Sequence, residues 1–391
     1  MKSLNICNIY TGAWCLYLLQ GSFYEKGGLI GRMLILFILL VSLYYFATTL
    51  LFKSNQPSYL KILDVVVIFF SIYGLYSILT GTVAVTEHGT ERGGSDFLRQ
   101  YYSSLLPIYA YYSFAKQGLI NQRWLYRWSW IFVVVAVIAF FTRRQEMLLA
   151  AYYMGLGQTE FTNNIAYLFV ALIPLIALVS NKKYYHWLLW TVVLVFSLLS
   201  FKRGAILVSA ISFIYYLFLS FGSNSKNKNR YVIISILVIV AVYFTVEYLF
   251  QSSDYFRFRL EVTEEGAVSQ RDVLFSSAWQ VFKDADLAHK LLGYGANMTA
   301  SLIGNGAHND WLEILVNHGL VGITLFIFYW ITLFKTWRKT KYDESIRMAL
   351  GLFFIVTFLR TLFSFSIGDM SFFEASVVGY CLAFRNTKYV N

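Results

Sequence analysis

Proline, charged residues and cysteine are all scarce in this sequence. Three of the 391 residues are proline and 14% are charged, whereas 58% are hydrophobic. An average soluble protein carries about 25% charged residues and about 5% proline. The composition therefore excludes a soluble domain with an ordinary core and favours a chain that folds within a lipid bilayer.

The few cysteines and histidines give no sign of a metal site or a disulfide framework. Cys7, Cys15 and Cys381 all lie inside apolar runs, where cysteine behaves as a small hydrophobic residue. The sequence has no phosphate-binding G-x-x-x-x-G-K-[ST] and no H-E-x-x-H. We therefore expect no metal ion and no other cofactor, and chemistry that uses ATP is disfavoured.

The apolar residues come in runs long enough to cross a membrane. A helix needs about 17–25 such residues to span about 30 Å of hydrocarbon. We predict an all-α integral membrane protein with about 12 transmembrane helices. The first run follows Lys2 without a cleavage site and is expected to be a retained span. The predicted spans lie near residues 4–20, 30–52, 60–84, 99–115, 125–141, 162–180, 186–200, 204–222, 230–250, 311–334, 346–366 and 370–385.

The distribution of charge predicts how the chain is oriented. The net charge of +11 comes from Lys and Arg scattered through short loops, so membrane topology explains it better than nucleic-acid binding. The Lys and Arg bias predicts that both termini are cytoplasmic, because the cytoplasmic loops then collect most of the basic residues and have Asp343 and Glu344 as their only acids. The chain is then a single polytopic membrane domain, 1–391, with one large extracytoplasmic loop, 251–310, between spans nine and ten. Because long loops in membrane proteins are usually functional, this loop is expected to carry part of an active site.

Two cations stand in a tight hairpin on the side that should be poor in them. Lys202 and Arg203 join two apolar spans, and Gly204 follows directly. One interpretation is structural, with Lys202 facing the end of the preceding helix dipole and Arg203 reaching lipid headgroups. The other is that the guanidinium of Arg203 binds phosphate oxygens of an anionic, lipid-linked substrate.

A second polar cluster, residues 304–313, precedes the tenth span. Asp310 and Glu313 have the spacing of a helix N-cap and its third residue, so capping is the leading interpretation for both carboxylates. His308 then lies just outside the helix, where the positive end of the dipole favours a neutral imidazole that can accept a proton. A lone histidine is more often structural, so a catalytic role competes with that alternative.

Two further charged groups have structural alternatives. Arg271 begins a predicted amphipathic helix from Asp272 to Val281, and a surface ion pair with Asp272 or Glu265 is the simpler explanation for it. Arg360 and Asp369 lie near the outer ends of the last two spans, where unpaired charge is costly. They are expected to form a structural ion pair.

These motifs resemble the bacterial O-antigen ligase and polymerase superfamily. His308-Asn309 is followed after nine residues by Gly319-Leu320-Val321-Gly322, which fits the spacing of the ligase branch. The segment from Phe201 to Ala205 is similar to the family's extracytoplasmic Arg motif. Arg271 with the later Gly293-Tyr294-Gly295 is similar to its loop Arg and glycine turn. The similarity covers roughly residues 160–335 by motif and the whole chain by topology.

The resemblance implies a metal-independent glycosyltransferase. Its donor would be a glycan on undecaprenyl pyrophosphate, with Arg203 and Arg271 stabilising the leaving group and His308 taking the proton of the acceptor hydroxyl. It also implies substrate-binding roles for Lys202, Tyr294 and Asn309. The enzyme would be a multi-pass protein of the bacterial cytoplasmic (inner) membrane with its active site facing the periplasm.

Three functions are consistent with the sequence. The first is a polymerase of O-antigen or capsule repeat units, favoured by the Lys-Arg-Gly hairpin and an aromatic content of 19%. The second is an O-antigen ligase that transfers the finished glycan to lipid A core, favoured by the His spacing. The third is a flippase or transporter of lipid-linked oligosaccharide, which the one-sided loop and the lack of an inverted repeat disfavour. Expected partners are the glycan donor, the acceptor, membrane lipid and, as a further candidate, a chain-length regulator.

Overall fold

The fold is an assembly of helices with one small β-hairpin. The computed structural model describes residues 5–51, 56–86, 89–153, 161–179, 185–222, 228–257, 271–340, 343–364 and 366–384. Within these ranges β1 (Val83–Val85) pairs antiparallel with β2 (Glu91–Gly93), and all other regular structure is helical. The predicted all-α class is confirmed, apart from this hairpin.

Each predicted span coincides with one or two helices. The span near 99–115 is divided at Leu106, because Pro107 opens a new helix, and the span near 162–180 is divided at Ala171 and Leu172. The predicted amphipathic helix after residue 271 is also present as α13. The helices of the first half are α1 (Ile6–Leu18), α2 (Leu29–Leu51), α3 (Ser58–Thr80), α4 (Gly94–Leu105), α5 (Pro107–Lys116), α6 (Gln122–Tyr153), α7 (Ala166–Val170) and α8 (Ile173–Leu178). Those of the second half are α9 (Tyr185–Leu199), α10 (Arg203–Gly222), α11 (Lys228–Ser252), α13 (Arg271–Asp284), α14 (Leu287–Leu292), α15 (Met298–Leu302), α16 (Asp310–Lys339), α17 (Glu344–Phe363) and α18 (Phe372–Phe384).

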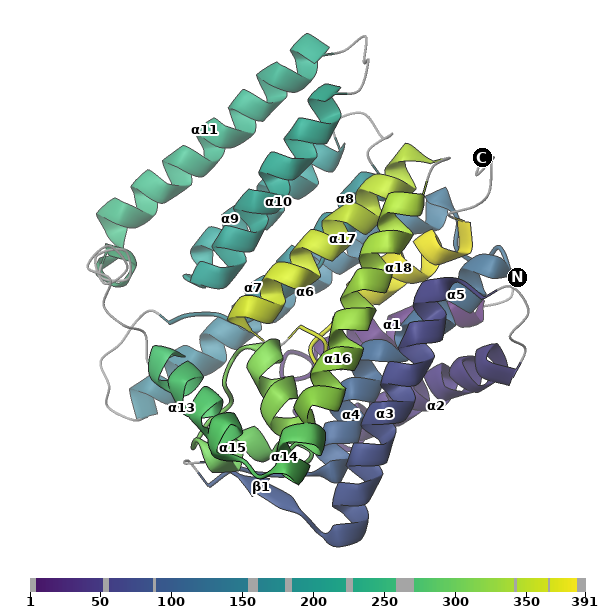
Figure 1. Ribbon diagram of the computed structural model, residues 1–391. Helices are drawn as coiled ribbons and strands as arrows, with labels where there is room; N and C mark the ends of the chain where they lie inside the picture. Colours follow the sequence, from purple (N-terminus) through teal and green to yellow (C-terminus); the bar gives the residue numbers. More distant parts are fainter. Residues whose placement is uncertain are drawn as a thin grey trace.

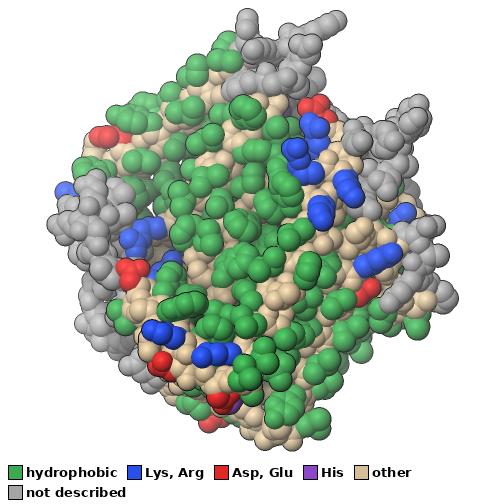
Figure 2. Space-filling view, viewed as in Figure 1, with side chains coloured by type: hydrophobic (Ala, Val, Ile, Leu, Met, Phe, Trp, Pro, Cys, Tyr) green, Lys and Arg blue, Asp and Glu red, His purple; other side chains and the backbone are tan. Residues whose placement is uncertain are grey.

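The surface matches a bilayer environment. Six helices in the described ranges, α2, α3, α6, α11, α16 and α17, are long and apolar enough to cross a membrane. Four apolar segments are shorter: α7 with α8, α9, α10 and α18. Figure 2 shows hydrophobic side chains across the middle of one face, with Lys, Arg, Asp and Glu toward its edges. The count of twelve crossings, the cytoplasmic termini and the side of the large loop stay predictions.

The large loop forms a compact helical group at one end of the bundle. In Figure 1, α13, α14 and α15 gather beside β1 at the lower end of the view, next to the start of α16. Helices α13 and α14 both pack on α16, and α15 packs on β1. Residues 258–270 of the predicted loop lie outside the described residues. The described part of the loop is therefore a folded cap on the bundle.

Helix α16 is broken where this cap docks. Gly319 has φ 61° and ψ −159°, so the chain leaves helical geometry there and resumes it afterwards. The backbone N–H groups of Tyr294 and Gly295 donate hydrogen bonds of 3.0 and 2.9 Å to the carbonyls of Val316 and Asn317. The Gly-Tyr-Gly turn therefore satisfies carbonyls that the broken helix leaves without an internal partner.

Gly293 is required at this contact because backbone lies against backbone. A Cβ at Gly293 would lie 2.3 Å from the carbonyl carbon of Asn317, and the residue has φ +75°. We expect Gly293→Ala to lower the free energy of unfolding by at least about 1–3 kcal/mol, measured as thermal unfolding in detergent. Gly12→Ala is the control, since nothing lies within 4 Å of that Cβ. Unchanged unfolding of Gly293→Ala would contradict the assigned contact.

Candidate functional site

The Lys-Arg hairpin is held in a fixed conformation. Phe201 has φ 53°, in the left-handed region that residues with a side chain rarely adopt. The carbonyl of Ser200 accepts a 2.8 Å hydrogen bond from the backbone N–H of Asn163, and its hydroxyl accepts one from the N–H of Lys202. Lys202 therefore projects from a constrained turn, and Arg203 starts α10 immediately after it.

His308 also lies in a constrained turn, just before α16. Its φ is 51°, and with Phe201 and Asn297 it is one of three non-glycine residues with positive φ in the described ranges. Backbone strain of this kind concentrates at functional sites. The N-cap of α16 is Asn309, whose side-chain oxygen accepts from the N–H groups of Trp311 and Leu312. The prediction that Asp310 is the N-cap was wrong by one residue, because Asn caps as well as Asp.

The two carboxylates after His308 are anchors. Asp310 is buried, and its Oδ2 accepts hydrogen bonds of 2.8 and 3.2 Å from the backbone N–H groups of Ser366 and Ile367. Glu313 accepts a 2.5 Å bond from the N–H of Ala307 and one from the amide of Asn317. Both carboxylates fix the turn that carries His308.

His308 and Lys202 line the same cavity. Its volume is about 400 Å³, and its walls also include Tyr167, Arg360 and Asp369. The Nζ of Lys202 lies 5.8 Å from the centroid of the Tyr167 ring, and the guanidinium carbon of Arg360 lies 5.0 Å from it. The cavity therefore combines an imidazole with two cations, which come from two loops and α17, and a tyrosine ring from α7.

Arg360 has a different partner from the one predicted. Its Nη1 lies 2.9 and 3.1 Å from the two carboxylate oxygens of Glu374, and both side chains are almost fully buried, with 2% and 0% exposed. Toward Asp369 it donates only to the backbone carbonyl, at 3.1 Å. The predicted ion pair with the Asp369 side chain was wrong, because the first turn of α18 brings Glu374 closer.

Burial and nearby cations keep His308 neutral. Desolvation lowers the pKa of its imidazole below the usual value, and the charges of Arg271, Lys202 and Arg92 lower that pKa further. At pH 7 the ring is therefore uncharged and can accept a proton. Burial has the opposite effect on the neighbouring carboxyl of Asp369, whose pKa is raised.

The other predicted site residues, Arg203, Arg271, Tyr294 and Asn309, do not line this cavity. Arg271 is the first residue of α13, close enough for its charge to act on His308. Among the described residues no carboxylate lies within 4 Å of it, so the ion pair with Asp272 is absent; Glu265 lies outside the described residues. The Tyr294 ring stacks on His289 at 4.3 Å. The roles of Arg203, Arg271, Tyr294 and Asn309 in binding or catalysis stay predictions.

Two residues near His308 were missed by the sequence analysis. Arg92, exposed on β2, has a charge that reaches both His308 and Asp369. Tyr167 lies between Lys202 and Arg360, and a Cβ at Gly204 would lie 2.7 Å from its hydroxyl oxygen. The signal for Arg92 was its place in a loop on the side expected to be poor in basic residues. No sequence signal separated Tyr167 from the chain's other tyrosines.

An Asp-x-Asp pair, which can hold a divalent cation, is also present and was overlooked. Asp284 accepts a hydrogen bond from Gln280. Asp286 caps α14 and lies 2.8 Å from the Nδ1 of His289. Within the described ranges no group of three or more His, Cys, Asp or Glu is arranged to hold a metal ion.

Comparison with known protein families tests the resemblance that the sequence motifs predict. Residues 187–327 match the model of a family described as O-antigen ligase. The resemblance to the O-antigen ligase and polymerase superfamily is confirmed. The matched segment includes Lys202, Arg203, Arg271, the Gly-Tyr-Gly turn and His308. Comparison with curated proteins gave no match. Members of the O-antigen ligase and polymerase superfamily are glycosyltransferase-like enzymes, and this likeness does not separate polymerase from ligase.

The buried pair of Arg360 and Glu374 provides a test of the cavity wall. Glu374→Gln would leave a buried cation without its counter-charge, and we expect a loss of about 3–5 kcal/mol in the free energy of unfolding. Replacing both residues by Met should lower the free energy of unfolding by clearly less, because no uncompensated charge remains. Thermal unfolding in detergent measures both. Equal losses for the single and the double variant would show that charge compensation is not what stabilises this wall.

Proposed function

We propose that this chain is a polymerase of glycan repeat units carried on undecaprenyl pyrophosphate. It would transfer the growing glycan from one lipid carrier to a hydroxyl at the non-reducing end of a new lipid-linked unit. The observation that carries the proposed glycosyl transfer is the cavity that a neutral His308 lines together with Lys202, with the charges of Arg271 and Arg92 acting on His308. The match to the O-antigen ligase family supports the same chemistry.

In the proposed reaction His308 acts as the general base. The acceptor hydroxyl oxygen attacks the anomeric carbon of the donor while its proton passes to the imidazole. The bond between that carbon and the phosphate oxygen breaks, and the electron pair leaves with undecaprenyl pyrophosphate. A single displacement of this kind inverts the anomeric configuration.

The cations would stabilise the leaving group. Negative charge accumulates on the pyrophosphate as the glycosidic bond breaks, and fixed cations at that point lower the barrier. Lys202 is placed for this role because it lines the cavity with His308. Arg271 is assigned the same role because its charge acts on His308, and Arg203 because it directly follows Lys202. The active site would face the periplasm from the cytoplasmic membrane.

An O-antigen ligase is the second candidate. It is favoured by the description of the matching family and by the nine-residue spacing from Asn309 to Gly319. The polymerase is preferred for its Lys-Arg-Gly hairpin and its aromatic content of 19%, which suits binding of sugar faces and a polyisoprenyl chain. The two differ only in the acceptor, so the cavity supports either reaction.

Product size distinguishes the candidates. The protein in lipid would be given one undecaprenyl-pyrophosphate repeat unit, with and without lipid A core, and the products separated by electrophoresis. A ladder without lipid A core is expected for the polymerase. Transfer only in its presence would establish the ligase instead. No product from a competent donor would favour a transporter.

His308→Ala should reduce the rate of glycosyl transfer by about 10²–10⁴-fold, because it removes the proposed general base. His289→Gln, outside the cavity, should leave the rate unchanged.

The pH dependence tests the assigned base. The value of kcat/KM, which reports the pKa of the free enzyme, should fall on the acid side as His308 becomes protonated, with a midpoint below the ordinary imidazole value of about 6.5. Lys202→Met removes a cation that lowers this pKa, so the acid midpoint should move to higher pH by up to about one unit. Lys283→Met, on the exposed end of α13, is the control. A midpoint that does not move, or moves to lower pH, contradicts the assignment of His308 as the base.

A further inference from the structure

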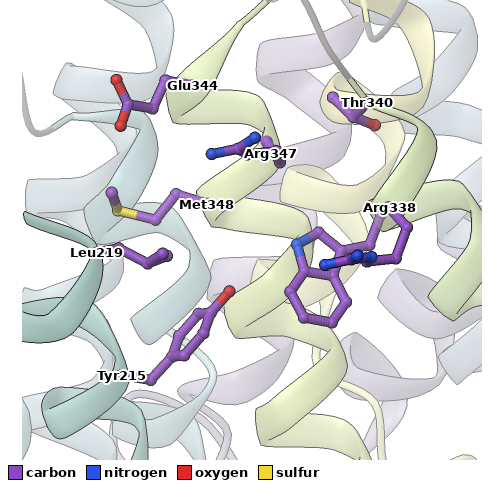
Figure 3. A pocket seen from close by; sticks show the side chains of 8 residues that line it. Tyr215, Leu219, Arg338, Thr340, Glu344, Arg347 and Met348 are labelled. Atoms are coloured by element: carbon purple, nitrogen blue, oxygen red, sulfur yellow. The ribbon is translucent and has the colours of Figure 1, made fainter. Parts of the chain in front are cut away.

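A second polar cavity lies at the other end of α10, α16 and α17. Its volume is about 390 Å³, and Figure 3 shows side chains from all three helices converging on it. Helix α10 starts near His308 and contributes residues of its final turns here, whereas α17 contributes its first turn. The cavity is thus separate from the glycosyl-transfer site. Its lining includes Tyr215, Trp337, Arg338, Thr340, Glu344 and Arg347.

Two guanidinium groups supply the charge of this cavity. Arg338 comes from the last turn of α16 and Arg347 from the start of α17. Glu344 also lines the cavity, but in the part of the chain that the structure describes no carboxylate lies within 4 Å of either arginine. The cavity therefore has a net positive charge that its own acid does not neutralise.

The floor of the cavity offers further hydrogen-bond donors. A Cβ at Gly351 would lie 2.8 Å from the indole nitrogen of Trp337 and 2.9 Å from the hydroxyl oxygen of Tyr215. The indole nitrogen and the hydroxyl oxygen therefore both lie close to Gly351, and both residues line the cavity. Two guanidinium groups with an N–H and an O–H beside them form an arrangement suited to phosphate oxygens.

An apolar groove adjoins this cavity and runs along α10 and α17. It has a volume of about 450 Å³, and Tyr215 lines both the groove and the cavity. The other walls are aliphatic and aromatic, among them Ile214, Phe218, Phe354 and Phe358. Ile214 and Phe218 are 66% and 75% exposed, so the groove opens outward. A ligand with a phosphate and a hydrocarbon chain would contact both parts.

We propose that this cavity and groove form a binding site for a net-anionic glycerophospholipid. The phosphate binds Arg338 and Arg347, and one acyl chain lies in the groove between α10 and α17. Cationic pockets between membrane helices bind anionic headgroups in this way. Basic residues at this end of the bundle are expected from the predicted membrane topology. That topology does not explain why two arginines line one cavity together with an indole N–H and a tyrosine O–H, or why this cavity adjoins an apolar groove.

The test compares lipids retained by the full-length protein. Protein released from nanodiscs with equal amounts of phosphatidylglycerol, phosphatidylethanolamine and phosphatidylcholine would be analysed by native mass spectrometry. We expect the wild type to retain phosphatidylglycerol in preference to both others. The double variant Arg338→Gln with Arg347→Gln should lower that retention by about tenfold. Tyr215→Phe, which keeps the ring and removes one donor, should lower it by less.

A matched control distinguishes binding in this cavity from nonspecific electrostatic attraction of anionic lipid to basic residues. Lys335→Gln with Lys339→Gln removes the same charge from the same end of α16, at exposed residues that do not line the cavity. This pair should keep wild-type retention, and an equal loss would overturn the proposal. Preference for phosphatidylethanolamine would overturn it too. So would thermal stabilisation by inorganic phosphate as large as that by phosphatidylglycerol, since the groove would then contribute nothing.

Discussion

The break in α16 at Gly319 is the constraint on which the rest of the site depends. Within a membrane, a helix can be interrupted only where another segment satisfies the backbone groups that the break releases. Here the turn from Gly293 to Gly295 does so, with two N–H groups donating to the carbonyls of Val316 and Asn317. The loop cap and the broken helix therefore form one unit. The glycines of the two motifs are needed for the same contact, although about 25 positions in the sequence separate them.

That unit determines where His308 stands. The short helical segment before the break is fixed on three sides: by Asn309 at its N-terminus, by Asp310 bound to the loop before α18, and by Glu313 bound to Ala307. Each of these hydrogen bonds involves a carboxylate or an amide side chain that, from the sequence alone, could have been assigned a catalytic role. With these groups occupied, the left-handed turn presents the imidazole to the cavity. The position of the His308 imidazole thus depends on Asp310 and Glu313, which take no part in the proposed proton transfer.

Sequence patterns predicted the positions of helices and of candidate site residues well, but they predicted the interaction partners of side chains poorly. Apolar run length located the helices. Unusual placement of charge singled out Lys202, and a position just before a helix singled out His308; the structure brings both to one cavity. Spacing could not tell which residue would cap α16, since Asn309 and Asp310 are adjacent and both types cap. It also could not give the partner of Arg360, because a turn's path decides whether Asp369 or Glu374 faces it. Tyr167 and Arg92 come from distant segments, so only the folded chain brings them near His308.

The charges around the cavity pose a conflict that the substrate would resolve. Arg271, Lys202 and Arg92 suit a pyrophosphate, yet each of them lowers the pKa of His308 and so weakens it as a base. In the proposed reaction the bound donor carries negative charge into the same space. It offsets the cations and raises the pKa of the imidazole again. The base would therefore be weak in the empty site and stronger with donor bound, so that proton abstraction is favoured only when a leaving group is in place.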